Sequence, residues 1–505
     1  MAGCGGQGGG AAARPFRWCV AGRSRARLAS EVTDRLAALG LPMPDEIVEV
    51  DNFDDSGLRR LLSRARLCLS CAGPYRFLGE PVVHACVDSG TDYADICGEP
   101  EFFDRMRLKY HDTAAAAGVL VLHACAFDSV PADLGALWTA QAFLAPPPAS
   151  CPAGSGSGGP NGGTSGSGGG GSGGGGGAGG GGICSSVESY ICVSAGPAGA
   201  AGHYATYASA VHGFGAAQQL RALRAELRQR FLSPEVPRVG PRPPGGVFHG
   251  DGGASFVTGH AFKFPGADSS VVRSTQASLA ARLGPAPAAA GGALGLCPHF
   301  GAYFTLPGAW QAVQMAVFGG VFQALARHEW GRSLLLKYPG AFTNGVFTHE
   351  GPTEQQLVDT SFTMTFVARG YSPSAAVAAI AAAGAAGKGS ASLSESTSET
   401  EPLSGAATGR SPALPPLPPD RTIITQMRGP EPGYVATPAI FLAVARCLLA
   451  ERPALGELGG CFTPGAVLVA SARLRAWLEE EGVHFDVLSD RVVSASVAAV
   501  RSAAV

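Results

Sequence analysis

Residues 67–83 read LCLSCAGPYRFLGEPVV, and this stretch decides the fold class. The apolar run 67–71 predicts a strand that is covered on both faces. A tight turn is expected at Gly73-Pro74, because this dipeptide interrupts regular structure. Pro81 then suits the first turn of a helix that continues through apolar residues to a glycine. The stretch therefore predicts one strand–turn–helix unit of a parallel sheet.

The same unit recurs on both sides of this stretch. Segments with apolar residues at helical spacing lie between short apolar runs. Strands and helices that alternate at short spacing predict an α/β fold, a Rossmann-type doubly wound parallel sheet. The predicted strands of this sheet are 18–21, 47–50, 67–71, 93–96 and 119–123.

The second half of the chain has a different pattern. Apolar and polar residues alternate in several runs, which predicts strands with one open or differently covered face. A second, mixed α/β domain is expected from them. Its predicted strands are 187–193, 362–368, 422–428 and 484–488, and its predicted helices are 437–449 and about 466–480.

Composition divides the chain further. Residues 1–13, 145–182 and 373–420 are dominated by Gly, Ala, Ser and Pro, and such stretches bury too little apolar surface to offset the entropy of ordering them. The run 373–420 is predicted to be a loop inserted between two strands. The expected divisions are 1–13 (low complexity), 14–144 (nucleotide-binding domain), 145–182 (linker), 183–372 (second domain), 373–420 (insertion), 421–490 (remainder of the second domain) and 491–505 (tail).

Charge and cysteine usage exclude several classes of protein. The net charge is −2 and no long basic run occurs, so the clustered positive surface that nucleic acid requires is missing. The 13 cysteines are scattered and odd in number, which predicts a reducing compartment and no disulfide framework. Residues 68–71 form a lone CxxC within a predicted strand, where the two thiols point to opposite faces, and we predict no metal site.

One uncharged stretch, residues 300–326, is long enough to span a membrane. It contains Pro307 and the glutamines Gln311, Gln314 and Gln323, which disfavour a span. We expect a buried helix here, and a helix that lies on a membrane surface is the alternative.

Ligands of an open parallel sheet bind at the carboxyl ends of its strands. Arg23 and Ser24 follow the first predicted strand, where arginine can bind a ribose 2′-phosphate through two N–H groups and serine can add a bond. The alternative for this pair is a solvated helix start with Ser24 as its N-cap. Further cofactor-binding candidates at this edge are Asp51 after the second strand and Ala72, Gly73 and Pro74 after the third.

Polar side chains near the same edge are candidates for proton transfer. Tyr75 follows the predicted turn and Asp128 follows the fifth strand, so these two are the catalytic candidates. Asp133 has an alternative role as the cap of the next helix. Further polar candidates are Glu99, Asp133 and His203.

Several motifs together resemble the saccharopine dehydrogenase-like oxidoreductases. The most specific are GPYRFLGEPVV at 73–83 and FDSVPADLG at 127–135. The others are WCVAGRS at 18–24, DICGEP at 95–100, GFG at 213–215, GPEPGY at 429–434 and FTPG at 462–465. The likeness covers most of residues 16–490 outside the low-complexity stretches.

The resemblance implies an oxidoreductase with NADP or NAD as its cofactor. Related bacterial proteins are trans-acting enoyl reductases, which implies a lipid-type carbonyl or enoyl substrate and a part in lipid metabolism such as glycolipid biosynthesis. Animal relatives associate with lipid droplets and membranes. The expected location is therefore intracellular, at a lipid droplet or membrane, with a mitochondrial location and a homo-oligomer left open.

The chain departs from the family pattern at its start. The family begins with a strand, a glycine-rich turn and a helix, and this unit would precede Trp18 and hold the pyrophosphate of a dinucleotide. Residues 3–8 match G-x-G-x-x-G, but no strand precedes them. Two interpretations remain open. The sequence is truncated, or the protein has lost dinucleotide binding and is a non-catalytic lipid-droplet or membrane-associated protein on a decayed Rossmann fold.

Overall fold

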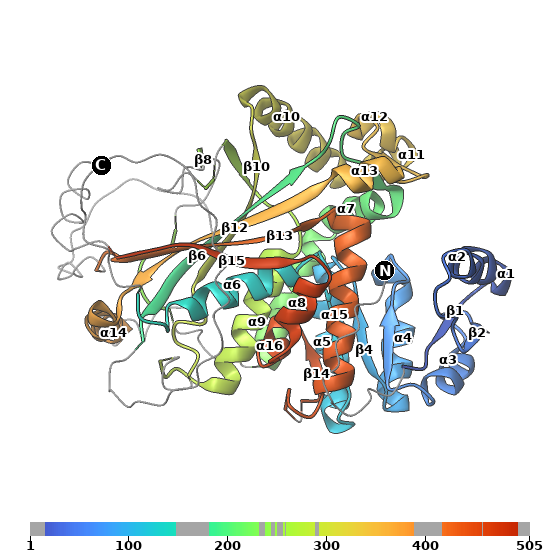
Figure 1. The fold of residues 1–505 in the computed structure, drawn as a ribbon, viewed down its shortest axis with the longest axis horizontal. Helices are drawn as coiled ribbons and strands as arrows, with labels where there is room; N and C mark the ends of the chain where they lie inside the picture. Colours follow the sequence, from blue (N-terminus) through green and yellow to red (C-terminus); the bar gives the residue numbers. More distant parts are fainter. Residues whose placement is uncertain are drawn as a thin grey trace.

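The chain forms two main sheets with helices packed against them (Figure 1). One is a parallel sheet of four strands and the other is a mixed sheet of seven strands, accompanied by two sheets of two strands each. The predicted α/β class with a second mixed domain is thereby confirmed. The computed structural model describes residues 16–147, 181–231, 238–243, 248–249, 256–257, 259–287, 292–387, 417–456 and 458–492.

All five parallel strands predicted from the first part of the chain are present. They are β1 (Cys19–Gly22), β2 (Glu46–Glu49), β3 (Leu67–Ser70), β4 (Asp92–Asp95) and β5 (Leu120–Leu122). The four-stranded sheet has the order β14-β5-β4-β3, so β14 (Gly460–Phe462) returns from near the end of the chain to pair with β5. The helices of this part are α1 (Arg25–Leu28), the π-helix η1 (Ala29–Thr33), α2 (Asp34–Ala38), α3 (Asp55–Leu62), α4 (Tyr75–Ser89), α5 (Pro100–Ala116) and α6 (Val130–Ala142).

Strands β1 and β2 form a separate parallel pair. Within the described residues, β1 pairs only with β2 and β3 pairs only with β4, so each has an edge without a partner strand. Cys19 on β1 is near enough to Cys68 on β3 for the second thiol to contribute to the raised pKa of the first, after burial and Glu46. These two unpaired edges are where the sheet departs from a continuous Rossmann sheet.

The prediction that Pro81 lies in the first turn of its helix is wrong, because α4 begins at Tyr75. Pro81 lies inside the helix instead. The reason is a distant cap. The carboxylate of Glu99 accepts the backbone N–H groups of Tyr75 and Arg76, which have no partner within the helix.

The mixed sheet has the order β15-β13-β12-β6-β10-β9-β8 and contains every strand predicted in the second half. All its pairs are antiparallel except β10 with β6. Residues 183–191 of β6 are buried on both faces, so of the two expectations, an open face or a differently covered face, the open face is wrong for this strand. The strands are β6 (Ile183–Ser194), β8 (Phe248–His249), β9 (His260–Lys263), β10 (His299–Leu306), β12 (Ser361–Tyr371), β13 (Arg421–Pro430) and β15 (His484–Val492), and β7 (Gly202–His203) pairs separately with β11 (Phe347–Thr348).

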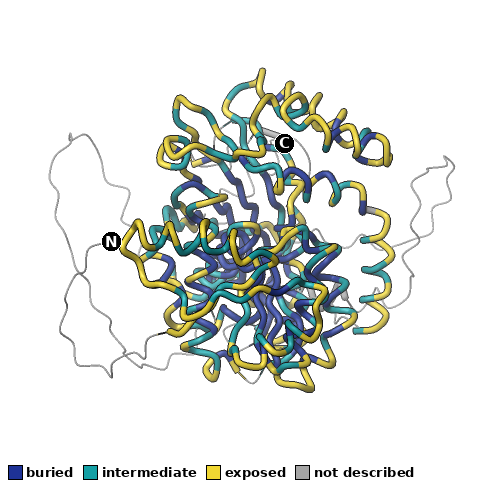
Figure 2. The backbone as a smooth tube through the Cα atoms, turned by 90° about the vertical axis from the view of Figure 1, so that its right-hand side faces the viewer, coloured by how far each residue is buried: buried dark blue, intermediate teal, exposed yellow. Residues whose placement is uncertain are grey.

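Helix α6 joins the two halves of the protein, because it packs against β6, β12 and β13. Its apolar side chains share one core with β12 and α15, and this buried interior lies at the centre of the molecule (Figure 2). The remaining helices are α7 (Tyr204–Gly215), α8 (Ala217–Arg230), α9 (Asp268–Leu283), α10 (Ala309–Ala326), α11 (Glu329–Lys337), α12 (Pro339–Thr343), α13 (Glu354–Asp359), α14 (Pro373–Gly387), the π-helix η3 (Pro432–Ala436), α15 (Thr437–Glu451), α16 (Pro464–Leu468) and α17 (Leu474–Glu480).

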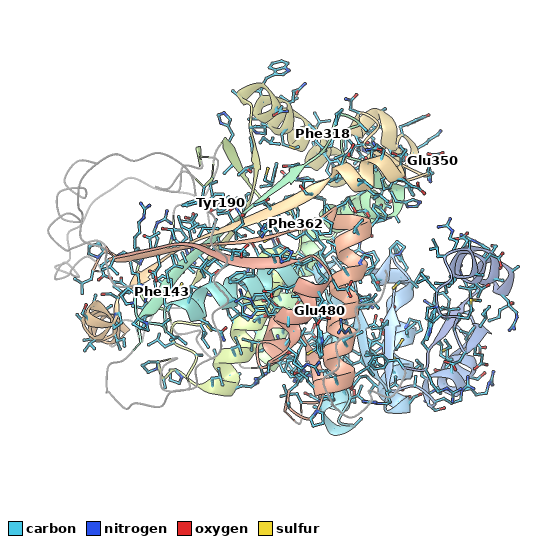
Figure 3. The ribbon with its side chains drawn as sticks, in the orientation of Figure 1. Phe143, Tyr190, Phe318, Glu350, Phe362 and Glu480 are labelled. Carbon is cyan, nitrogen blue, oxygen red and sulfur yellow. The ribbon has the colours of Figure 1, made fainter. Side chains whose placement is uncertain are left out.

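The prediction of one buried helix at 300–326 is wrong. The stretch divides at Pro307 into β10 and α10, and α10 buries only Ala312, Phe322 and Ala326. Figure 3 shows Phe318 on α10, at the outer end of the molecule and far from the sheet residue Phe362. Apart from the half-buried Met315 and Leu325, the other apolar side chains of α10 are exposed among the described residues.

Two further predictions need correction. Residues 373–387 of the predicted loop form the helix α14, because this stretch is rich in alanine, the residue with the highest helix propensity. The helix expected at about 466–480 is two helices, α16 and α17, separated by a turn. The low-complexity stretch 1–13 and most of 145–182, 388–420 and 491–505 lie outside the described residues.

One helical run among the described residues, Pro432–Glu451, is long and apolar enough to cross a membrane by length and composition. Its α15 part buries Ile440, Phe441 and Val444 in the main core. Part of the run is therefore packed within the protein.

Candidate functional site

A buried aspartate–histidine pair lies where β4 and β5 end. Asp95 Oδ2 is 2.7 Å from His123 Nδ1, and both side chains are almost inaccessible to solvent. The other carboxylate oxygen of Asp95 accepts the backbone N–H groups of Cys97 at 3.1 Å and Ala124 at 2.9 Å. These bonds fix the orientation of the imidazole.

The second ring nitrogen of His123 has no partner among the described residues. It borders a cavity of about 10 Å³, lined also by Asp104, Arg107 and Thr463. A cavity of this size holds about one water molecule.

Asp128 follows β5 and brings a second carboxyl group to this edge. Its side chain is reached by solvent, yet surrounding protein atoms, and after them the charges of Asp95 and Glu99, raise its pKa from 3.8 to about 6. A carboxyl group with this pKa can both hold and release a proton near neutral pH. Of the two predicted catalytic residues, Asp128 has the electrostatics that proton transfer requires.

Gly98 allows Asp128 to lie close to the main chain. A Cβ atom at position 98 would be 3.0 Å from Asp128 Oδ1. Asp268 on α9 approaches from the second half of the chain, where its Oδ1 accepts a hydrogen bond from Ser129 Oγ at 3.3 Å. Burial and the charge of Asp128 raise the pKa of Asp268 well above its usual value. The fold thus gathers several carboxyl groups at one edge.

Tyr75 lies in the wall of the same edge. Its phenol donates to the carbonyl oxygen of Ser70 at 2.8 Å, and burial raises its pKa. The phenol therefore keeps its proton, and its hydroxyl group is engaged in this hydrogen bond to the backbone. A catalytic role for Tyr75 stays a prediction.

Arg23 is an exposed cation at the carboxyl end of β1. Ser24 is the N-cap of α1 and accepts the N–H of Arg27 at 3.3 Å. The neighbouring arginines are engaged: Arg27 pairs with Glu31, and Arg25 donates to the carbonyl of Ile47. Arg23 has no ion-pair partner within the described ranges, and it therefore remains available for an anionic ligand.

The other predicted cofactor contacts differ in accessibility. Ala72 and Gly73 are exposed after β3, and Pro74 is half-buried at the N-terminus of α4. Asp51 is half-buried after β2 and accepts the N–H of Phe53 at 2.9 Å. Their role in cofactor binding stays a prediction.

These residues fit the adenosine end of NADP. Arg23 would offer its exposed guanidinium to a 2′-phosphate, and the adjacent Ser24 hydroxyl would donate a hydrogen bond, although both roles stay predictions. The described part of the chain contains no group of three or more His, Cys, Asp or Glu side chains that could hold a metal ion.

Two of the further polar candidates have structural partners. Asp133 Oδ2 accepts hydrogen bonds from Thr275 Oγ1 and the N–H of Gly465, both at 2.7 Å. It therefore joins α6 to α9 and α16, and the helix cap expected of it is at Ser129 instead. His203 is the N-cap of α7 and accepts the N–H of Ala205 at 3.1 Å.

Asp95, His123 and Asp268 were not predicted as site residues from the sequence. Asp95 and His123 stand at the ends of two predicted strands, and this shared position was the available signal. Asp268 has no such signal, because only the packing of α9 brings it to the edge.

The sequence comparisons agree with this arrangement. The family described as saccharopine dehydrogenase NADP binding domain matches residues 1–122, which confirms NADP or NAD as the predicted cofactor class. A putative trans-acting enoyl reductase of Mycobacterium tuberculosis is 41% identical over 118 residues, 23% of this chain and 27% of its own length. A lipid droplet localized protein of Caenorhabditis elegans is 25% identical over 94% of this chain and 92% of its own length.

A mammalian relative that covers most of the chain has a higher sequence identity to it than the Caenorhabditis elegans protein. The saccharopine dehydrogenase-like oxidoreductase of Mus musculus is 32% identical to this chain, over 94% of this chain and 90% of its own length. The chain therefore belongs to the saccharopine dehydrogenase-like oxidoreductase family.

Proposed function

We propose that this protein is an NADP(H)-dependent reductase of a lipid-type carbonyl or enoyl substrate, with its reacting centre at the carboxyl ends of β3, β4 and β5. The observation that carries the proposal is Asp128, which is reached by solvent and has a pKa raised to about 6. It lies at the edge where ligands of parallel sheets bind. The partial match to a trans-acting enoyl reductase supports the substrate class.

Different residues of the chain bind the cofactor and transfer the proton. Arg23 and Ser24 hold the 2′-phosphate end of the cofactor, and Ala72, Gly73 and Pro74 line the path toward the reacting centre. Bound NADPH supplies the hydride. Asp128 holds the proton that the second atom of the reduced double bond takes up. Asp95 keeps His123 fixed behind this centre.

A fluorescence titration of the full chain with NADPH and with NADH tests the proposal. Micromolar binding of NADPH, tighter than that of NADH, is expected. If a folded protein binds neither cofactor, the titration is repeated with a strand and glycine-rich turn added before Trp18. Binding that appears only then would indicate a truncated sequence, and a folded protein that still binds neither cofactor would show that the reductase proposal is wrong.

A second proposed function is attachment to a lipid surface, favoured by the exposed apolar face of α10. Trp310, Val317 and Val321 are 71%, 64% and 48% exposed. Such side chains on one helix are suited to the boundary between lipid headgroups and acyl chains. The relative named as a lipid droplet localized protein supports this proposal. Flotation with phospholipid-coated triolein droplets tests it, and a full chain that stays in the aqueous fraction would exclude it.

The location proposed for the protein is the surface of a lipid droplet or membrane. A fluorescently tagged full chain should coincide with a lipid droplet stain. Coincidence with a mitochondrial marker alone would support the mitochondrial alternative and contradict the droplet proposal.

A further inference from the structure

A cavity of about 350 Å³ lies next to the candidate site, between the two parts of the molecule. The first turns of α4 and α5 form one wall, and α7, α8 and α11 form the other. Arg76 connects the cavity to the site, because its backbone N–H donates to Glu99 at 3.3 Å. Interfaces of this kind are frequent places for small-molecule binding.

Three arginines and one glutamate supply the charged groups of the cavity wall. Arg76 and Arg105 donate to Glu101 at 3.1 and 3.0 Å, and each also forms an ion pair with a second carboxylate, Glu99 for Arg76 and Glu80 for Arg105, so their charge is compensated. Arg332 on α11 donates to the carbonyl oxygen of Ala326, and it has no carboxylate partner in the part of the chain that the structure describes. Arg332 is therefore the uncompensated cation of the cavity wall, and it favours an anion at its position.

His212 responds to this positive charge. Burial first, and then Arg76 and Arg332, lower its pKa. Its carbonyl oxygen accepts a hydrogen bond from Arg76 at 2.9 Å, and its ring packs edge-on against Phe77. A neutral imidazole adds no further charge to the wall at neutral pH.

Gly215 is what allows Arg332 to reach the cavity. A Cβ atom at position 215 would be 2.8 Å from Arg332 Cδ and 3.1 Å from its Nη1. Any larger residue at this position would displace the guanidinium. The close approach indicates that the position of the Arg332 cation is built into the fold.

An apolar helix packs against α11, the helix that carries Arg332. This helix is α10, whose Val317 and Val321 are 64% and 48% exposed. An uncompensated cation whose helix packs against an exposed apolar helix matches a ligand with an anionic end and an apolar chain.

We propose that this cavity binds the oxyanion headgroup, a carboxylate or phosphate, of an amphipathic substrate, with Arg332 as the main contact and the acyl chain along α10. This inference deepens the proposed reductase function and rests on it, because it takes the cavity as part of the same substrate site. A charge-assisted bond to a guanidinium selects for the oxyanion, and α10 selects for the chain.

Isothermal titration of the full chain with octyl phosphate, inorganic phosphate and octanol tests the proposal. Octyl phosphate should bind about tenfold more tightly than either of the others, because only it has both parts of the ligand. Equal binding of octanol would show that the cation does not contribute. Equal binding of inorganic phosphate would show a free-phosphate site and would overturn the amphipathic ligand.

Matched variants locate the binding to the cavity. Arg332→Gln should weaken octyl phosphate about tenfold, while Arg327→Gln, an exposed charge outside the cavity, should leave it unchanged. Gln219→Glu keeps shape but adds a negative charge in the cavity wall, and the exposed neighbour Gln218→Glu is its control. The Gln219 pair keeps the test decisive if Arg332→Gln does not fold. Equal effects within either pair would overturn the proposal.

The titrations contain no cofactor, so their outcome is independent of hydride transfer. A protein that binds octyl phosphate through Arg332 but binds neither NADPH nor NADH would keep the headgroup site and lose the reductase proposal. A protein that binds NADPH but shows no preference for octyl phosphate would do the reverse.

Discussion

The carboxylate of Glu99 accepts the backbone N–H of Tyr75 at 2.9 Å, from a position that follows β4 in the chain. The same carboxylate accepts the N–H of Arg76 at 3.3 Å. One buried side chain therefore caps the N-terminus of α4, which lies at the candidate site. Burial raises the pKa of Glu99, and these two bonds oppose that effect. The first turn of α4, and with it Tyr75 and Arg76, depends on this cap.

Removal of the cap should destabilise the protein. Glu99→Ala leaves two N–H groups without an acceptor in a buried setting, and we expect it to lower the free energy of unfolding by about 2 kcal/mol. Glu99→Gln retains an acceptor oxygen and should cost about half as much. Urea unfolding measures both. Equal losses for the two variants would contradict capping by the carboxylate oxygens.

Arg23 should decide the preference between the two cofactors. Arg23→Gln removes the proposed contact with the 2′-phosphate, so the dissociation constant for NADPH should rise about tenfold while that for NADH stays unchanged. Arg27→Gln is the control, since Arg27 is also exposed but is paired with Glu31. Fluorescence titration measures both cofactors. Equal loss of NADPH and NADH binding would place Arg23 outside the 2′-phosphate contact.

Asp128 should leave a signature in the dependence of stability on pH. Its pKa is about 6 in the folded protein against a usual value of 3.8, so the folded state binds the proton more tightly than the unfolded state. Its contribution to stability therefore falls as the pH rises from about 4 to about 6. Asp128→Asn does not titrate and should become more stable, relative to the wild type, across this interval.

Urea unfolding at a series of pH values checks this expectation. Identical pH dependence of the two proteins would show that the carboxyl group of Asp128 has an ordinary pKa. If Asp128 also supplies the proton in catalysis, turnover should fall as the pH rises through about 6 and should drop about a hundredfold in Asp128→Asn.

Attachment to lipid should depend on the exposed face of α10. Val317→Asp places a charge in this face and should lower the fraction that floats with triolein droplets about tenfold. Val358→Asp on α13 is the control, because it changes a valine on another helix that is even more exposed than Val317, at 80% against 64%. Flotation that is equally reduced by both variants would indicate general hydrophobicity instead of a specific surface.

The contact between Gly135 and Phe366 should be critical for stability. A Cβ atom at position 135 on α6 would be 2.2 Å from the ring of Phe366 on β12, which is fully buried. Gly135→Ala should lower the free energy of unfolding by about 2 kcal/mol through overpacking. The double variant with Phe366→Leu should lose less than the sum of the two single changes. Additive losses would show that the two positions are independent.

The sequence by itself determined the parallel sheet and the family. Short apolar runs that alternate with helices are typical of such a sheet, and β1 to β5 appear where these runs lie, although β1, β2 and β3 are partly exposed. The cap of α1 at Ser24 was equally readable, because a helix cap depends on residues that adjoin in the chain. The specific motifs at 73–83 and 127–135 gave the family, and with it the cofactor class.

Features that depend on contacts between distant residues could not be predicted from local sequence patterns. The start of α4 required Glu99, and the exposed state of α10 could not be foreseen because apolar composition is the same for a buried helix and a surface helix. The cavity needed α4, α5 and α11 to meet, which places Arg76 and Arg332 together. Local patterns report short-range preferences, whereas caps, exposure and charge clusters arise from contacts between segments that are far apart in the chain.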